Sequence, residues 1–134
     1  MRVLRIPRGV PLGYAAALLA FAVDGLYLAL IARQDTGWTS RIAFVAGSLA
    51  AAGTVCATAE LCAGFAAGVG AAWAAATLWI WAVLAGASIG LLLAPAGVLA
   101  TVALTRRAHG ALAVAVGIAA ALLVGAAGLA WTPA

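Results

Sequence analysis

The segment from Ile42 to Leu104 constrains the fold most, because its 63 residues contain no arginine or lysine and a single acid, Glu60. Soluble domains carry about 25% charged residues, so a segment this poor in charge cannot form a hydrated surface. It is long enough for two membrane-crossing helices of about 20–28 residues joined by a short hairpin. We therefore expect this part of the chain to fold within lipid.

The same character extends over the whole chain of 134 residues, of which 68% are hydrophobic and 7% are charged. The mean hydropathy is +1.22. No stretch between the apolar segments is long enough to fold separately, so we expect a single transmembrane domain over 1–134. The sequence predicts an all-α integral membrane protein, a bundle of four transmembrane helices. The helices are expected at about 10–32, 42–66, 74–104 and 111–131.

The hairpin between the second and third helices is expected within 64–73. The helix propensity is lowered there by three glycines, Gly64, Gly68 and Gly70. The tryptophans that follow suit a membrane interface. The third helix is then one continuous helix that contains Pro95.

All seven cationic residues are arginines, and the abundant residue types have GC-rich codons. This indicates the inner cell membrane of a bacterium with a GC-rich genome. With four helices, three arginines would lie on the side of the N-terminus and four on the other side, so the charge bias that sets orientation is nearly balanced. We expect the N-terminus inside, with insertion in both orientations as an alternative. A five-helix layout would restore a clear bias.

Asp24 is the candidate site residue with the strongest physical argument. It lies near the middle of the first expected helix, and its side chain is too short to reach water at either surface. A charge at that depth costs about 2.5–3.5 kcal/mol on insertion scales, and intramembrane acids usually face the bundle interior or a water-filled cavity. Two interpretations remain open: a protonated Asp24 that hydrogen-bonds to a neighbouring helix, and an ion or proton site.

Further polar residues can be placed at or near the depth of Asp24. Tyr27 lies on the same face of the first helix. If the helices alternate in direction, the depth of Asp24 corresponds to three other places: Ser48, Ser88 to Pro95, and Gly117. These residues would form a polar layer around Asp24.

Glu60 lies about 27 Å along the second expected helix, close to a membrane surface. A carboxylate at the wet end of a helix and a proton or substrate site are both open for it. Cys56 and Cys62 would lie about 9 Å apart along the axis of that helix, whereas a disulfide needs Cα atoms within about 7 Å. We expect two reduced thiols that face different sides of an unbroken helix.

The residue patterns of common catalytic and metal sites are missing from the sequence. The single histidine, His109, follows Arg106 and Arg107 in a short polar loop, where a topological anchor or contact with phospholipid headgroups is expected. The two cysteines lack metal-site spacing, and no Ser-His-Asp or Cys-His arrangement exists within the membrane. We therefore expect no enzyme, no cofactor and no metal. Basic surfaces with interleaved aromatics are also missing, which excludes nucleic-acid binding.

Two functions of different classes fit these observations. The first is a small accessory or structural subunit that packs against itself as a homo-oligomer or against a larger membrane protein. The alternative is a small oligomeric proton-coupled transporter or channel that uses Asp24 as its proton or ion site. Glu60 is a second candidate for the same role. In that case Tyr27, Ser48 and Ser88 are the residues expected to assist proton, ion or substrate binding. The lipid bilayer is a direct partner in both cases.

Overall fold

The computed structural model describes residues 12–34, 37–61, 64–85, 89–106 and 110–131. Within them the chain forms five α-helices: α1 (Leu12–Gln34), α2 (Ser40–Leu61), α3 (Phe65–Leu84), α4 (Ile89–Arg106) and α5 (Ala111–Trp131). In lipid the backbone N–H and C=O groups have no water to bond, so apolar segments adopt helices, which satisfy these groups internally. The expected all-α fold class is confirmed.

Four of the five helices, α1, α2, α3 and α5, are long and apolar enough to cross a membrane. The remaining helix, α4, has 18 residues, which span about 27 Å at 1.5 Å per residue. A hydrocarbon core is about 30 Å thick, so α4 is close to the length of a crossing. The number of long helices agrees with the expectation, but their positions differ between Gly64 and Leu104.

The prediction of a hairpin within 64–73 is wrong, because this segment forms the first half of α3. Gly64, which precedes the helix, has a φ of 100°, a conformation that glycine adopts readily. Gly70 lies inside α3, and a Cβ atom at this position would lie 3.1 Å from Val55 of α2. The glycines within α3 therefore permit close packing, since breaking the helix in lipid would leave backbone groups without partners.

The prediction of a single helix at 74–104 is also wrong, because α3 ends at Leu84 and α4 begins at Ile89. The amide of Ala85 donates a hydrogen bond to the carbonyl of Trp81 at 2.8 Å and closes the end of α3. Gly90 lies directly against the carbonyl oxygen of Ala82, where a side chain would not fit. The glycine thus allows α4 to return closely along α3.

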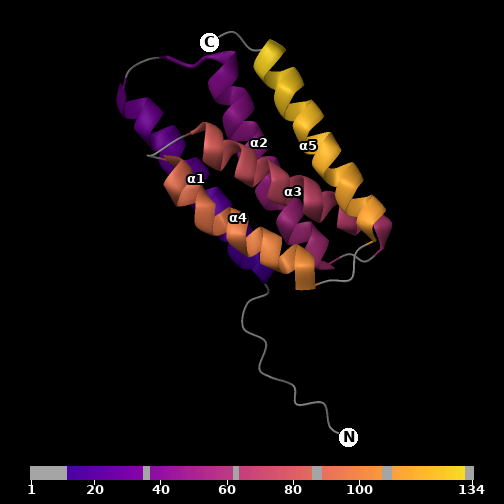
Figure 1. Cartoon of the computed structure of the whole chain (residues 1–134). Coiled ribbons are helices and arrows are strands. Elements are labelled where there is room, and N and C mark those ends of the chain that lie inside the picture. The colour runs from indigo at the N-terminus through magenta and orange to yellow at the C-terminus, as the bar shows by residue number, and fades with distance from the viewer. Residues whose placement is uncertain (1–11, 35–36, 62–63, 86–88, 107–109, 132–134) are drawn as a thin grey trace, which may run out of the picture.

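The central helix of the bundle is α3, which packs against α2, α4 and α5, whereas α1 packs against α2 and α4. In Figure 1 successive helices alternate in direction, so α1 begins at the lower end and α5 finishes at the upper end. The core shared by the first four helices consists mainly of alanines around three large buried side chains, Leu49, Leu78 and Leu93. Aromatic rings also rest on glycines of neighbouring helices, for example Phe21 on Gly53.

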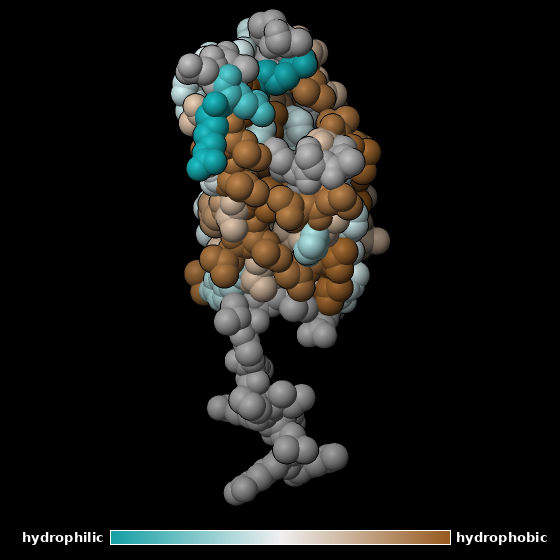
Figure 2. All heavy atoms as spheres, turned by 90° about the vertical axis from the view of Figure 1, so that its left-hand side faces the viewer, coloured by the Kyte–Doolittle hydropathy of each residue, from teal (hydrophilic) through white to brown (hydrophobic). Residues whose placement is uncertain are grey.

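The surface has the distribution of polarity expected of a membrane protein. Figure 2 shows hydrophobic side chains across the middle of the face on the α1 and α4 side, and hydrophilic side chains gathered near the upper end. Exposed apolar residues on these two helices include Leu18 and Leu91. The upper end of α1 carries exposed Arg33 and Gln34. The apolar middle matches lipid, and the polar end matches a membrane surface.

Candidate functional site

The inner face of α1 is a stripe of small residues at helical spacing. Its buried members are Gly13, Ala16, Ala17, Ala20 and Val23, followed by Asp24. Small side chains let the backbone of a helix approach its neighbours closely, and here the neighbours are α2 and α4. Asp24 is therefore carried into the bundle by the packing of its own helix.

Asp24 lies near the midpoint of α1 and is 8% exposed. Its Oδ1 atom is buried and has no hydrogen-bond partner among the residues that the structure describes. A buried polar atom left without a partner costs about 1–3 kcal/mol, and more when it is charged. The interhelical hydrogen bond expected of a purely structural Asp24 is thus not found at Oδ1 within the described ranges.

Tyr27 is the polar residue closest to Asp24 along the inner face of α1. Three positions separate the two residues, a spacing that makes them neighbours on a helix surface. Tyr27 is half-buried. Hydrogen bonds between Tyr27 and Asp24 are not found among the described residues. The two candidate residues lie within one turn of each other on α1.

The described members of the expected polar layer do not gather around Asp24. Ser48 lines a cavity whose described lining comes from α2, α3 and α5. Pro95 is exposed on α4, and Gly117 packs against α3. Ser88 lies outside the described residues. The described part of the expected layer is not found, because equal depth in the membrane does not fix the direction in which each helix turns a residue.

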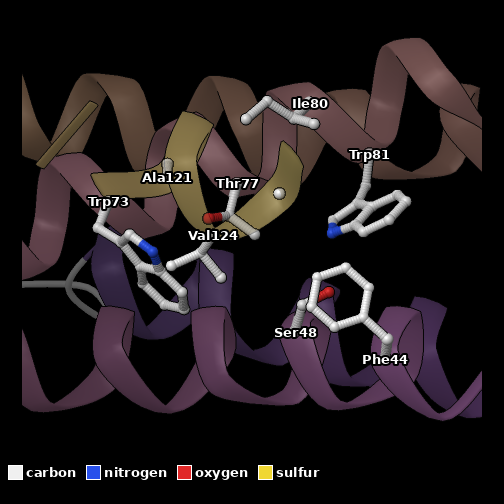
Figure 3. Close-up of a pocket in the computed structure, with 9 residues that line it drawn as sticks. Phe44, Ser48, Trp73, Thr77, Ile80, Trp81, Ala121 and Val124 are labelled. Atoms are coloured by element: carbon white, nitrogen blue, oxygen red, sulfur yellow. The ribbon is translucent and has the colours of Figure 1, made fainter. Parts of the chain in front are cut away.

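The cavity beside Ser48 is small, with a volume of about 10 Å³. Figure 3 shows Thr77 of α3 beside the cavity, between Trp73 and Trp81, with Phe44 on the α2 wall. The rings of Phe44 and Trp81 pack edge to face with centroids 5.9 Å apart. This volume is close to the minimum for one water molecule.

Sequence reasoning missed Thr77, which is only 6% exposed. A threonine within an alanine-rich helix gives no signal by its type. The spacing of the sequence did give a signal. Thr77 lies four residues from Trp73 and four from Trp81, so the three residues share one face of α3. All three line the cavity.

Several hydroxyl groups in the helices donate hydrogen bonds to carbonyls of their own helix. The hydroxyl of Ser48 donates to the carbonyl of Val45 at 2.8 Å, that of Thr54 to the carbonyl of Ala50 at 2.9 Å, and that of Thr101 to the carbonyl of Gly97 at 2.8 Å. Thr101 also accepts a hydrogen bond from the Trp79 indole across α3 and α4, at 2.8 Å. This local bonding is open to a hydroxyl because it carries its own donor, whereas a carboxylate has none.

The remaining candidate residues contribute less to the site. Glu60 belongs to the last turn of α2, and its side chain lies outside what the structure describes. Cys56 is buried in the core. Since α2 ends at Leu61, Cys62 falls outside the described residues, as does His109. Among the described residues, no three His, Cys, Asp or Glu side chains come together in a group that could hold a metal ion.

No family model matches the chain, and neither a curated protein nor a solved structure matches it. The fold itself defines the class: an all-α, multi-pass membrane protein. Its function has to be inferred from the chemistry of the site.

Proposed function

We propose that the protein is a small proton-coupled transporter or channel in which Asp24 takes up and releases a proton inside the membrane. The observation that carries this proposal is the buried Oδ1 atom of Asp24, which has no hydrogen-bond partner among the described residues. Such an atom costs stability, and no hydrogen bond to another described residue offsets the cost. Acids within membrane spans usually mark ion pathways, proton relays or ligand sites.

The chemistry available to Asp24 is reversible protonation. The neutral acid has one O–H donor, and the carboxylate has acceptors only. Release of the proton therefore requires water or a cation to reach the carboxylate, which in turn requires α1 to move against α2 and α4.

The test is infrared difference spectroscopy of the full chain in lipid bilayers during a pH titration. We expect a carboxylic acid C=O band that grows on acidification in the native protein and is missing from Asp24→Asn, which has nearly the same shape. Glu60→Gln serves as the control that assigns any band from the second acid on the helices. A native protein with no titrating Asp24 band over the pH range in which it stays folded contradicts the proposal.

The second candidate is an accessory or structural subunit, which acts as a homo-oligomer or binds a larger membrane protein. It is supported by the close backbone contact of Gly117 with α3, since such packing gives a stable bundle on which another protein can dock. In this case Asp24→Asn should leave intact both the folded protein and any complex purified with it from native membrane. A loss of proton binding with an unchanged complex would favour the first candidate.

We also propose that the protein lies in the inner membrane of a bacterium with a GC-rich genome, with its N-terminus inside. Five alternating helices put five arginines on the side of the N-terminus and two on the other. The first group is Arg2, Arg5, Arg8, Arg106 and Arg107, and the second is Arg33 and Arg41. This bias supports the proposed orientation. A reporter fused after Ala134 should be active only outside, and a signal from inside would contradict the five-crossing topology.

A further inference from the structure

We propose that the Asp24 site is selective for protons over metal cations, so that the protein couples to protons and not to sodium or potassium ions. This inference rests on the proposed function of Asp24 and names the ion that the site accepts. It is carried by the groups that the described helices place around the buried carboxyl group.

A proton and a metal cation make different demands on a buried carboxylate. A proton forms an O–H bond with one carboxylate oxygen and leaves a neutral acid, which is less costly inside a membrane than a charge. A metal cation keeps its charge and has to exchange its shell of water for protein oxygens. Calcium, for example, binds about 6–8 oxygens. A metal site therefore needs several oxygens, and a proton site needs one.

Buried polar side chains are scarce around Asp24. Among the described residues, Asp24 and Thr77 are the buried side chains of polar or charged type. Thr77 of α3 lines the cavity next to α2 and α5, whereas α1 packs against α2 and α4. The buried core shared by the first four helices consists of alanine, valine, leucine, cysteine and tryptophan side chains, which contain no oxygen. This described core therefore offers a metal cation no side-chain ligand of the kind it prefers.

Backbone oxygens near Asp24 are occupied by the hydrogen bonds of continuous helices. α1 runs unbroken from Leu12 to Gln34 and α2 from Ser40 to Leu61, so the carbonyls of their middle turns accept bonds within the helix. Sodium sites of transporters instead use the carbonyls of unwound helices. In α4, Pro95 lacks an N–H and releases the Leu91 carbonyl, but both residues belong to the exposed side of α4. The described helices thus present no set of carbonyls to a metal cation at Asp24.

Other titratable groups add at most one oxygen near Asp24, the phenol of Tyr27 one turn away on α1. The remaining such groups on α1, α2 and α4 are Tyr14, Arg33, Arg41, Cys56, Glu60 and Arg106. Tyr14 and Arg33 lie about 15 Å and 14 Å from Asp24 along the axis of α1. Those on α2 and α4, apart from the thiol, belong to the end turns of their helices. Water is therefore the group that takes the proton on release, when the acid O–H bond breaks and the proton bonds to a water oxygen.

The test is infrared spectroscopy of the full chain in bilayers of zwitterionic lipid, with the Asp24 C=O band as the readout. A metal cation that binds the carboxylate displaces the proton and removes this band. We expect the band to titrate over the same pH range in lithium, sodium, potassium and choline chloride at equal ionic strength. Choline is the matched control, because it screens charges to the same extent but is not coordinated by carboxylate oxygens. Asp24→Asn identifies the band, and Glu60→Gln removes the second acid of the helices.

The outcomes separate the selectivity from the proposed function. A titration that moves to lower pH when a metal cation replaces choline, in the native protein and in Glu60→Gln alike, overturns the selectivity and leaves proton binding at Asp24 intact. A shift that disappears in Glu60→Gln belongs to the second acid, and the Asp24 band then shows the expected selectivity. Absence of any titrating Asp24 band in all four salts removes the proposed function and the selectivity together.

Discussion

The two outer helices, α1 and α5, are attached to the bundle in similar ways but bury different kinds of side chain. α5 packs against α3 through small apolar residues, Ala113, Gly117 and Ala121. α1 packs against α2 and α4 through residues of the same kind, and then adds Asp24. Because small apolar residues suffice to attach α5, packing alone gives no reason for an acid on α1. The comparison therefore argues for a functional role of Asp24.

The cavity on the α5 side sharpens this contrast. Ser48, which lines the cavity, uses its hydroxyl hydrogen to bond the Val45 carbonyl of its own helix. Asp24 leaves a buried oxygen without a partner among the described residues. Among the described residues, the Ser48 hydroxyl is thus bonded within its own helix, whereas the Asp24 oxygen is not, and Asp24 is the better candidate for chemistry.

The largest effect on the free energy of unfolding is expected from a substitution that disrupts the packing of α5 against α3. A Cβ atom at position 117 would clash with the carbonyl of Val69 and would lie 2.6 Å from the Ala72 Cβ atom. Gly117→Ala should therefore lower the free energy of unfolding by about 1–3 kcal/mol, the usual cost of overpacking. The measurement is equilibrium unfolding in mixed micelles.

Gly125→Ala is the matched control on the same helix, since an added Cβ atom there meets nothing within 4 Å. It should leave the free energy of unfolding unchanged or raise it by up to about 1 kcal/mol, because alanine favours the helix over glycine. Equal destabilisation by both substitutions would show that the contact at Gly117 does not attach α5 in the way described.

The sequence predicted the outer helices better than the inner ones. For α1 and α5, polar or terminal residues flank one long apolar run, and α5 has the expected bounds of 111–131. Between Gly64 and Leu104 the chain offers no such flanks, because the residues that separate α3 from α4 are as small and uncharged as the helices themselves. The decisive feature, the contact of Gly90 with the Ala82 carbonyl, arises only when two helices meet.

The candidate site was predictable to the extent that it depends on one helix. The depth of Asp24 and its shared face with Tyr27 follow from helix geometry. The placement of Ser48 and Gly117 depends on which helices are neighbours, and this depends on packing between segments distant in sequence. The separation of Ser48 from Asp24 was therefore not visible in the spacing of residues.

A smaller effect, of opposite sign, is expected at Asp24. Asp24→Ala removes the buried oxygen that has no partner among the described residues, so the free energy of unfolding should be unchanged or higher by about 1 kcal/mol. Asp24→Asn, which keeps a buried polar group, should remain near the native value. Unfolding in the same micelles is the measurement. A loss of more than about 1 kcal/mol in Asp24→Ala would reveal a structural hydrogen bond and favour the accessory-subunit interpretation.

The smallest effects are expected for the hydroxyls beside the cavity. Ser48→Ala removes a bond to the Val45 carbonyl, which lies within a helix, and hydroxyl bonds of this kind contribute little or even bend the helix. Thr77→Val keeps the shape of a side chain that is 6% exposed. Each substitution should change the free energy of unfolding by less than about 0.5 kcal/mol, and the double variant should show the sum of the two changes.

If either substitution costs more than about 1 kcal/mol, or if the two are strongly coupled, the hydroxyls join α2 to α3 through a water in the cavity. The cavity side would then also contain a polar site of its own, and the contrast between α1 and α5 would no longer single out Asp24.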